Sequence, residues 1–256
     1  MHSYLIALLL LGTILLIGAY TLLKLRRVHL MLYQAQAQSA RSSKQLNDLF
    51  GQIESLLGLY VDLGLQKSLP PTRGWAASPD FLWQLTQYAL NEHPKTIVEC
   101  SSGVSTLVLA RCMQINGSGH IYSLEHESEF ACKTRQHLER HGLSEWATVL
   151  DAPLRPHQIK DETWSWYAEE VLPEGCKIDM LAIDGPPMHT RSLARYPAGP
   201  VLFSHLANNA AVFLDDAARE DEQAIMNLWC TEFPELRQTS LACEKGCAVL
   251  FKGFSV

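Results

Sequence analysis

The stretch from Thr96 to Glu125 constrains the fold more than any other part of this 256-residue chain. It consists of an apolar run TIVEC, a turn SSGVST, a helical pattern LVLARCMQI and a second apolar run IYSLE that ends on an acid. A strand that leads through a glycine turn into a helix leaves the backbone N–H groups at the helix N-terminus without partners, and an acid that ends the next strand can accept hydrogen bonds from both ribose hydroxyls. The stretch therefore predicts a pocket for a nucleotide-type cofactor.

Strand and helix patterns continue to alternate beyond this unit. Apolar runs at ATVLD, DMLAID and AAVFLD predict further strands, and a final pair around Gln238 and Val249, joined by the turn EKG, predicts an antiparallel hairpin. Such alternation is typical of βαβ units. We therefore predict an α/β fold with a doubly wound, mostly parallel seven-stranded sheet that ends in the hairpin. Between the strands we expect helices around residues 130–141, 201–207 and 222–229, and a tryptophan-rich segment at 163–172.

The order of strands, turn and acids resembles class I S-adenosylmethionine-dependent methyltransferases, in particular the O-methyltransferase-like group, over residues 69–256. The resemblance implies that Glu99 and Gly103 lie against the methionine end of the cofactor. It further implies that Glu125 binds the ribose and that Asp151 lies beside the adenine. The residues that it assigns to S-adenosylmethionine are Glu99, Ser101, Gly103, Ser105, Thr106, Glu125, His126, Asp151 and Ala152.

The turn SSGVST differs from the family pattern at one position, because Ser101 stands where the family usually has its first glycine. A side chain there reduces the space for close approach between backbone and ligand, which affects affinity rather than fold. A nicotinamide cofactor is the alternative, but a dinucleotide fingerprint needs three glycines and this turn has one. Hydroxyls of Ser105 and Thr106 at the helix N-terminus suit a carboxylate better than a pyrophosphate, which favours an amino-acid-bearing cofactor.

Carboxylates follow two of the predicted strands. Asp184 ends DMLAID, and Asp215 and Asp216 end AAVFLD. The carboxyl ends of parallel strands share one edge of the sheet, where ligands bind. The arrangement resembles metal-dependent O-methyltransferases of the catechol type, which implies a divalent cation such as magnesium at these three acids that activates and orients the acceptor hydroxyl. In the alternative without a metal, Asp184 contacts the ammonium group of the cofactor and Asp216 caps the next helix.

Transfer to oxygen without a metal needs a general base. His189, five residues beyond Asp184 in the segment PPMHTR, is the candidate, so Asp184 and His189 are the predicted catalytic residues. Arg191, Arg195 and Tyr196 follow in the same segment and are candidates for binding an anionic group of the substrate.

Aromatic residues of the tryptophan-rich segment have two interpretations. Trp164, Trp166 and Tyr167 either line a pocket for the acceptor or form a lid that packs on the sheet.

The N-terminus carries an apolar segment of membrane-spanning length. Tyr4 to Leu23 are twenty consecutive uncharged residues, which as a helix span about 30 Å, the thickness of the bilayer core. Lys24, Arg26 and Arg27 follow the segment, whereas a cleaved signal peptide has its positive charge before a shorter apolar region. We therefore predict a transmembrane anchor over residues 1–23, single-pass in the inner or plasma membrane, with the rest of the chain in the cytoplasm.

Residues 24–69 form the next predicted segment, an amphipathic helix with a heptad pattern. Apolar or small residues recur at alternating spacings of three and four, most regularly from Leu46 to Leu63, and Pro70 and Pro71 end the helix. The pattern fits either a homodimer or packing of the helix onto its own catalytic domain, which is predicted over residues 70–256. Ser78 and Pro79 then predict the start of the next helix, with Ser78 as its N-cap.

Charge and cysteine content exclude some classes of function. Residues 1–69 carry six basic and three acidic side chains, whereas the rest of the chain carries fifteen and twenty-four. Such an acidic domain lacks the basic surface that nucleic acid requires. Seven scattered cysteines show no zinc-like spacing and are typical of reduced thiols in a cytosolic protein.

Together these features predict a membrane-anchored methyltransferase that moves a methyl group to an oxygen of a small or lipid-linked acceptor, chiefly by positioning the reactants. The alternative is a catalytically inactive membrane scaffold that retains a degenerate methyltransferase fold.

Overall fold

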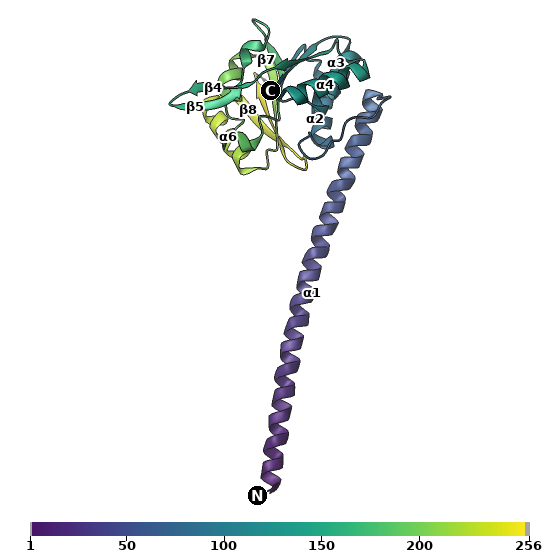
Figure 1. Ribbon diagram of the computed structural model, residues 1–256, viewed down its shortest axis with the longest axis vertical. Coiled ribbons are helices and arrows are strands. Elements are labelled where there is room, and N and C mark those ends of the chain that lie inside the picture. The colour runs from purple at the N-terminus through teal and green to yellow at the C-terminus, as the bar shows by residue number, and fades with distance from the viewer. Residues whose placement is uncertain (1, 254–256) are drawn as a thin grey trace. The chain divides into compact units, whose positions relative to one another are not determined.

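The computed structural model describes residues 2–253, which form two compact units, one up to Gly51 and one from Gln52 onward (Figure 1). The first unit is the greater part of α1 (His2–Leu63), a single helix in which the predicted anchor and heptad segments follow one another without a break. The helix was predicted to run to residue 69 and end at Pro70 and Pro71, but it ends at Leu63, because Gly64 adopts a left-handed conformation with a φ of 54°. Its large apolar side chains, such as Leu8 and Leu16, are exposed. Among the described helices, α1 alone is long and apolar enough to cross a bilayer.

The second unit is built on a seven-stranded sheet. Its strands are β1 (Thr96–Cys100), β2 (His120–Glu125), β3 (Ala147–Asp151), β6 (Ile178–Ile183), β7 (Leu206–Asp215), β8 (Leu236–Leu241) and β9 (Cys247–Lys252). Their order is β3-β2-β1-β6-β7-β9-β8, and β9 runs antiparallel to both of its neighbours while the other pairs are parallel. The predicted doubly wound sheet and its C-terminal hairpin are therefore confirmed.

Helices cover both faces of this sheet, because alternate residues of each strand point to opposite faces. One face carries α2 (Pro79–Glu92), α3 (Val104–Asn116) and α4 (Ser128–His141), and the other carries α5 (Ala198–Leu202) and α6 (Glu220–Glu232) (Figure 1). In β1, Ile97 belongs to the core that contains Phe81 of α2, whereas the adjacent Val98 belongs to the core that contains Trp229 of α6.

The C-terminal end of α1 belongs to the second unit and packs on it. Leu59 and Leu63 are fully buried in the same core as α2 and α3. The side-chain carbonyl of Gln52 accepts the backbone N–H of Asp80 at 3.2 Å, and Nε of Arg111 donates to the carbonyl of Leu63 at 2.8 Å. For residues 52–63, the heptad pattern thus reflects packing of the helix on its own domain.

The tryptophan-rich segment forms a hairpin rather than a connection of unspecified structure. β4 (Leu154–Ile159) and β5 (Glu162–Tyr167) pair antiparallel in a separate two-stranded sheet. Along β5, Trp164 and Trp166 are buried while Thr163 and Ser165 between them are exposed, which is the period of a strand with one covered face. Trp166 and Tyr167 are buried in the core with α6, so these aromatics form a packed layer on the sheet.

The prediction of a helix at residues 201–207 is wrong. In the structure α5 stops at Leu202, a 3-10 turn occupies Phe203–His205 and β7 starts at Leu206. β7 continues through Asn209, which has a φ of 64°, where its pairing with β6 shifts register. Asparagine tolerates this conformation and so permits a bulge inside the strand.

The start of α2 is at Pro79 as predicted, but Ser78 does not cap it with its side chain. Its hydroxyl instead donates to Oδ1 of Asp80 at 2.6 Å, and the same oxygen accepts the backbone N–H of Phe81 at 2.9 Å. Asp80, within the first turn, therefore supplies the acceptor that the prediction assigned to Ser78.

Candidate functional site

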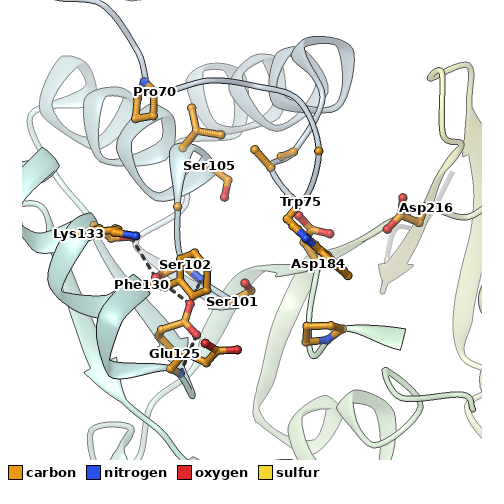
Figure 2. Close-up of a pocket in the computed structure, with 18 of the residues that line it drawn as sticks. Pro70, Trp75, Ser101, Ser102, Ser105, Glu125, Phe130, Lys133, Asp184 and Asp216 are labelled. Atoms are coloured by element: carbon orange, nitrogen blue, oxygen red, sulfur yellow. Dashed lines mark hydrogen bonds between the residues drawn. The ribbon is translucent and has the colours of Figure 1, made fainter. Parts of the chain in front are cut away.

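A cavity of about 510 Å³ lies at the edge of the sheet where β1, β2, β6 and β7 end (Figure 2). This is the edge at which ligands bind in open α/β sheets, and the volume is within the usual range for small-molecule sites. Figure 2 shows Glu125 and Ser102 on one side of the cavity, and Asp184 and Asp216 on the other. The predicted site residues on its wall are Ser101, Gly103, Ser105, Glu125, His126, Asp184, His189 and Asp216.

The turn after β1 forms one part of the wall. Ser101 has a φ of 93°, a left-handed conformation that favours glycine, which explains why the family pattern has glycine at this position. The conformation is held by two hydrogen bonds of 2.9 Å, one from its N–H to the carbonyl of Leu124 and one from the hydroxyl of Ser123 to its carbonyl. A Cβ placed on Gly103 would meet no atom within 4 Å, so the space in front of the turn is open.

Glu99 lies beneath this turn and does not reach the cavity. Its carboxylate accepts hydrogen bonds from the hydroxyls of Thr106 at 2.5 Å and Ser123 at 2.9 Å, and the Thr106 hydroxyl in turn accepts the N–H of Gly103 at 3.0 Å. Burial raises the pKa of Glu99 to about 7, although these hydroxyl donors lower it. In this structure Glu99 and Thr106 hold the shape of the turn and the first turn of α3 from below.

Glu125, at the end of β2, faces the cavity with both of its carboxylate oxygens hydrogen-bonded. Oε2 accepts the N–H and the hydroxyl of Ser102, each at 2.9 Å, and Oε1 accepts the N–H of Glu127 at 3.0 Å. Nδ1 of His126 lies 3.2 Å from Oε1. Burial raises the pKa of Glu125, but the donors from His126, Glu127 and Ser102 outweigh it, so its pKa lies below the ordinary value and the group stays ionised.

Ser102 was not among the predicted site residues. It is adjacent to Ser101 in the turn, and its contact with Glu125 depends on the parallel pairing of β1 with β2, which brings the ends of the two strands together.

Asp151 and Ala152, predicted beside the adenine, follow β3 and do not line the cavity. Ala152 is buried and donates its N–H to the carbonyl of Glu125 at 2.7 Å. Asp151 is exposed and forms an ion pair of 2.9 Å with Arg135 of α4.

The wall on this side comes instead from one face of α4. Its residues recur at spacings of three and four, as one face of a helix requires. They are Phe130, Lys133, Thr134 and His137. Phe130 is half exposed, and Nζ of Lys133 lies 5.4 Å from the centre of its ring. The periodicity was present in the sequence, but which face of the helix would meet the cavity depends on its packing against β2 and β3.

The three predicted metal-binding acids do come together. Asp184, Asp215 and Asp216 each place an oxygen within 4.8 Å of the others, and Asp184 and Asp216 also line the cavity. Burial and the neighbouring Asp215 raise the pKa of Asp184 well above its usual value, and burial together with Asp216 raises the pKa of Asp215 to about 6.

Arg195 lies within this acid cluster. Its Nη2 donates to Oδ1 of Asp184 at 3.1 Å and to Oδ2 of Asp216 at 2.8 Å, while Nη1 donates to the carbonyl of Asp215 at 2.8 Å. Sequence analysis placed Arg195 among the candidates for binding a substrate anion, but its side chain is only 4% exposed and is bonded to these acids.

The other two candidates for substrate anions lie outside the cavity wall. Arg191 donates to Glu162 at 2.5 Å and stacks over Trp164, with its guanidinium carbon 3.7 Å from the ring centre. The hydroxyl of Tyr196 donates to Glu232 at 2.9 Å. Both side chains therefore attach the segment after β6 to the β4–β5 hairpin and to α6.

His189 lies on the cavity wall in a 3-10 turn (Met188–Thr190) and is exposed. The ring of Trp75 packs edge-on against it, with ring centres 5.8 Å apart. Trp75 belongs to the segment between α1 and α2, which contributes further wall residues. Those further residues are Pro70, Pro71, Gly74, Ala76 and Ala77.

Comparisons with known proteins agree with this geometry. A family model described as a methyltransferase domain matches residues 98–217, the range that contains the turn, Glu125 and the acid cluster. A search of curated proteins gave no match.

Solved structures with a similar fold include three methyltransferases. The SAH-bound methyltransferase PaMTH1 of Podospora anserina has 14% sequence identity over 78% of this chain and 88% of its own, with a TM-score of 0.56. The O-methyltransferase of Bacillus cereus in complex with SAH has 17% identity over 79% and 91%, with a TM-score of 0.50. The O-methyltransferase TomG of Streptomyces achromogenes, involved in tomaymycin synthesis and in complex with SAM, has 14% identity over 79% and 89%, with a TM-score of 0.51. At these identities the similarity establishes the fold.

Proposed function

We propose that this chain is a class I S-adenosylmethionine-dependent methyltransferase that transfers the methyl group to an oxygen of a small or lipid-linked acceptor at a membrane. The observation that carries this proposal is the joint position of Gly103 and Glu125 on one cavity, with Asp184 on its opposite side (Figure 2).

The cavity wall supplies a suitable group for each part of the cofactor. Open space in front of Gly103 and the N-terminus of α3 at Ser105 suit the amino-acid end, because unpaired N–H groups favour a carboxylate. Glu125 stays ionised and can accept from ribose hydroxyls in place of its present bond to the Ser102 hydroxyl. The apolar ring of Phe130 on α4 suits a face of the adenine.

When bound, S-adenosylmethionine supplies a methyl group on a positively charged sulfur, and its transfer to oxygen leaves a neutral thioether. The residues of this chain contribute position and charge. Asp184 lies opposite Glu125 and places a carboxyl group on the side where the positive charge of the sulfonium would lie. His189 lies on the same wall and would accept the proton of the acceptor hydroxyl on a ring nitrogen.

The proposed location is the cytoplasmic face of the inner or plasma membrane. Support comes from the exposed apolar side chains of α1 and from Lys24, Arg26 and Arg27, which follow them. An anchored enzyme meets acceptors that are themselves held in the bilayer, which favours a lipid-linked acceptor over a freely diffusing one. The heptad residues before Gly51 provide a surface through which two such chains would pair as a homodimer.

Calorimetry with S-adenosylhomocysteine tests the assignment directly. The full-length chain in detergent micelles should bind it, and Glu125→Ala should abolish the signal. Glu139 is an exposed glutamate of α4 on the same side of the sheet, so the control variant Glu139→Ala should bind S-adenosylhomocysteine like the wild type. Absence of binding by the wild type would favour the alternative of an inactive scaffold. A labelled-methyl transfer assay with membrane and soluble extract fractions would then identify the acceptor class.

A further inference from the structure

The acid cluster at the ends of β6 and β7 already contains a cation. The guanidinium of Arg195 is buried, and its Nη2 bonds to carboxylate oxygens of both Asp184 and Asp216. The same nitrogen also donates to the backbone carbonyl of Asp184 at 3.0 Å. One side chain therefore links the end of β6 to the end of β7.

Further charges surround this arrangement. Nη1 of Arg195 lies 3.6 Å from Oε1 of Glu222, a buried carboxylate of α6. Nη1 of Arg219 lies 2.8 Å from the same oxygen of Asp216 that Arg195 bonds. Lys245 lines the cavity close enough to lower the pKa of Asp184 and Asp215, against the larger effect of their burial. The protein's own cations therefore offset most of the negative charge of the acids.

A divalent cation does not fit the cluster while Arg195 is in place. Carboxylate oxygens are the ligands that magnesium prefers, but it needs near-ideal octahedral geometry at about 2.1 Å. One oxygen of Asp184 and one of Asp216 already accept from a single guanidinium nitrogen, and the buried oxygens of the cluster that lack a partner, Oδ2 of Asp215 and Oδ1 of Asp216, lie beside the same guanidinium-bonded acids. An arginine keeps its proton in proteins, so a bound ion would stand beside a fixed positive charge in a buried site, where screening is weak.

We propose that Arg195 takes the position of the divalent cation in this chain, and that methyl transfer here is independent of metal. The claim about methyl transfer rests on the proposed function, whereas the claim that Arg195 takes the place of a metal ion does not. Arg195 is a positioning residue: it fixes the carboxyl group of Asp184 at the cavity wall and joins it to Asp216. A guanidinium does not activate an acceptor hydroxyl by coordination as a metal does, so removal of the proton falls to His189.

Binding of Mn²⁺ to the full-length chain in detergent micelles tests the proposal, with electron paramagnetic resonance as the readout. The wild type should show no saturable Mn²⁺ binding at the cluster. Arg195→Ala removes the internal cation and leaves three oxygen ligands, so it should bind Mn²⁺ at least about tenfold more tightly than the wild type. The double variant Arg195→Ala with Asp216→Asn should lose this gain. Arg191→Ala, which removes a nearby arginine outside the cluster, should behave like the wild type.

The outcomes separate the two proposals. The role of Arg195 would be overturned if the wild type binds Mn²⁺ saturably and Asp216→Asn removes this binding. It would also be overturned if Arg195→Ala folds but binds Mn²⁺ no more tightly than the wild type. If Arg195→Ala does not fold, the wild-type titration alone decides. Calorimetry of the wild type with S-adenosylhomocysteine, in magnesium and in chelator, should give equal affinities. Absence of any binding there would remove the proposed function while the Mn²⁺ result still stands.

Discussion

The backbone N–H and the hydroxyl of Ser102 both donate to Oε2 of Glu125, each at 2.9 Å. The turn after β1 and the acid that ends β2 are thus one hydrogen-bonded unit before any ligand is bound. Because the N–H cannot leave without moving the turn, while the hydroxyl can rotate away, the carboxylate is held in place and can still exchange one partner for a ribose hydroxyl.

Glu125→Gln should weaken binding of S-adenosylhomocysteine by about 10- to 100-fold, because a hydrogen bond to a charged acceptor contributes about 1.5–3 kcal/mol. The amide keeps the shape of the side chain but replaces one acceptor oxygen with a donor. Calorimetry measures the effect, with Glu139→Gln as the matched control on an exposed site. Equal affinity in Glu125→Gln and the wild type would contradict a role in ribose binding.

Glu99→Gln should change how stability depends on pH. The pKa of Glu99 is raised to about 7 in the folded chain, so the folded state binds more protons than the unfolded state between about pH 4.5 and 7. This carboxyl therefore lowers the stability of the wild type as pH rises through that window, by about 3 kcal/mol at most. Relative to the wild type, Glu99→Gln should gain in Tm as pH increases from 5 to about 7.5. A Tm difference that stays constant over this range would show that Glu99 is ionised in the fold throughout.

His189→Ala should lower the rate of methyl transfer by about 10²- to 10⁴-fold, the usual contribution of a general base, and leave the affinity for S-adenosylhomocysteine unchanged. The labelled-methyl assay measures the rate once an acceptor fraction is known. His205→Ala is the control, since His205 is exposed in a turn before β7 that does not line the cavity. A rate in His189→Ala equal to that of the control would assign the proton transfer to another group.

Leu59→Ala should destabilise the second unit by about 2–5 kcal/mol, because it leaves a cavity in the core at a fully buried position. Leu57→Ala is the matched control two residues earlier in α1, where the side chain is 61% exposed, and it should change stability by less than about 0.5 kcal/mol. Thermal unfolding in detergent compares the two. Equal Tm values would mean that the end of α1 does not pack on the domain in solution.

Deletion of residues 2–23 should release the chain from membranes. The wild type should stay in the membrane fraction after extraction at alkaline pH, whereas the shortened chain should appear in the soluble fraction. Folding of the second unit should persist, because this unit begins at Gln52 and the first residue of its hydrophobic core is Leu59. Release of the wild type by alkaline extraction would argue against a spanning segment.

Much of the fold was predictable from local patterns. Apolar runs such as TIVEC and IYSLE identify strands that are buried on both faces, and alternation with helices determines a parallel sheet. The same logic brought Glu125 and Asp184 to one edge, since both end parallel strands. The β4–β5 hairpin was missed, because a run of tryptophan and tyrosine fits several structures until the two strands are seen to pair.

The less predictable parts of the site depend on contacts between distant residues. Arg195 reaches Asp184 and Asp216, eleven and twenty-one positions away, and nothing in its own neighbours along the chain indicates that it would be buried. Glu99 is the opposite case. The family resemblance implied that it contacts the cofactor, whereas hydrogen bonds from Thr106 and Ser123 hold it under the turn. Sequence order identifies which residues approach the site, but side-chain packing decides which of them face the cavity.

The segment between α1 and α2 both connects the two helices and forms part of the cavity wall. Leu63 fixes the end of α1 in the core, and within a few residues Pro70 to Ala77 become part of the cavity wall, with Trp75 against His189. The stretch of chain that follows α1 thus forms part of the wall of the cavity in which we propose that the reactants bind. A shortened chain that starts at α2 would lack this part of the cavity wall, so ligand binding measured on it would not represent that of the whole protein.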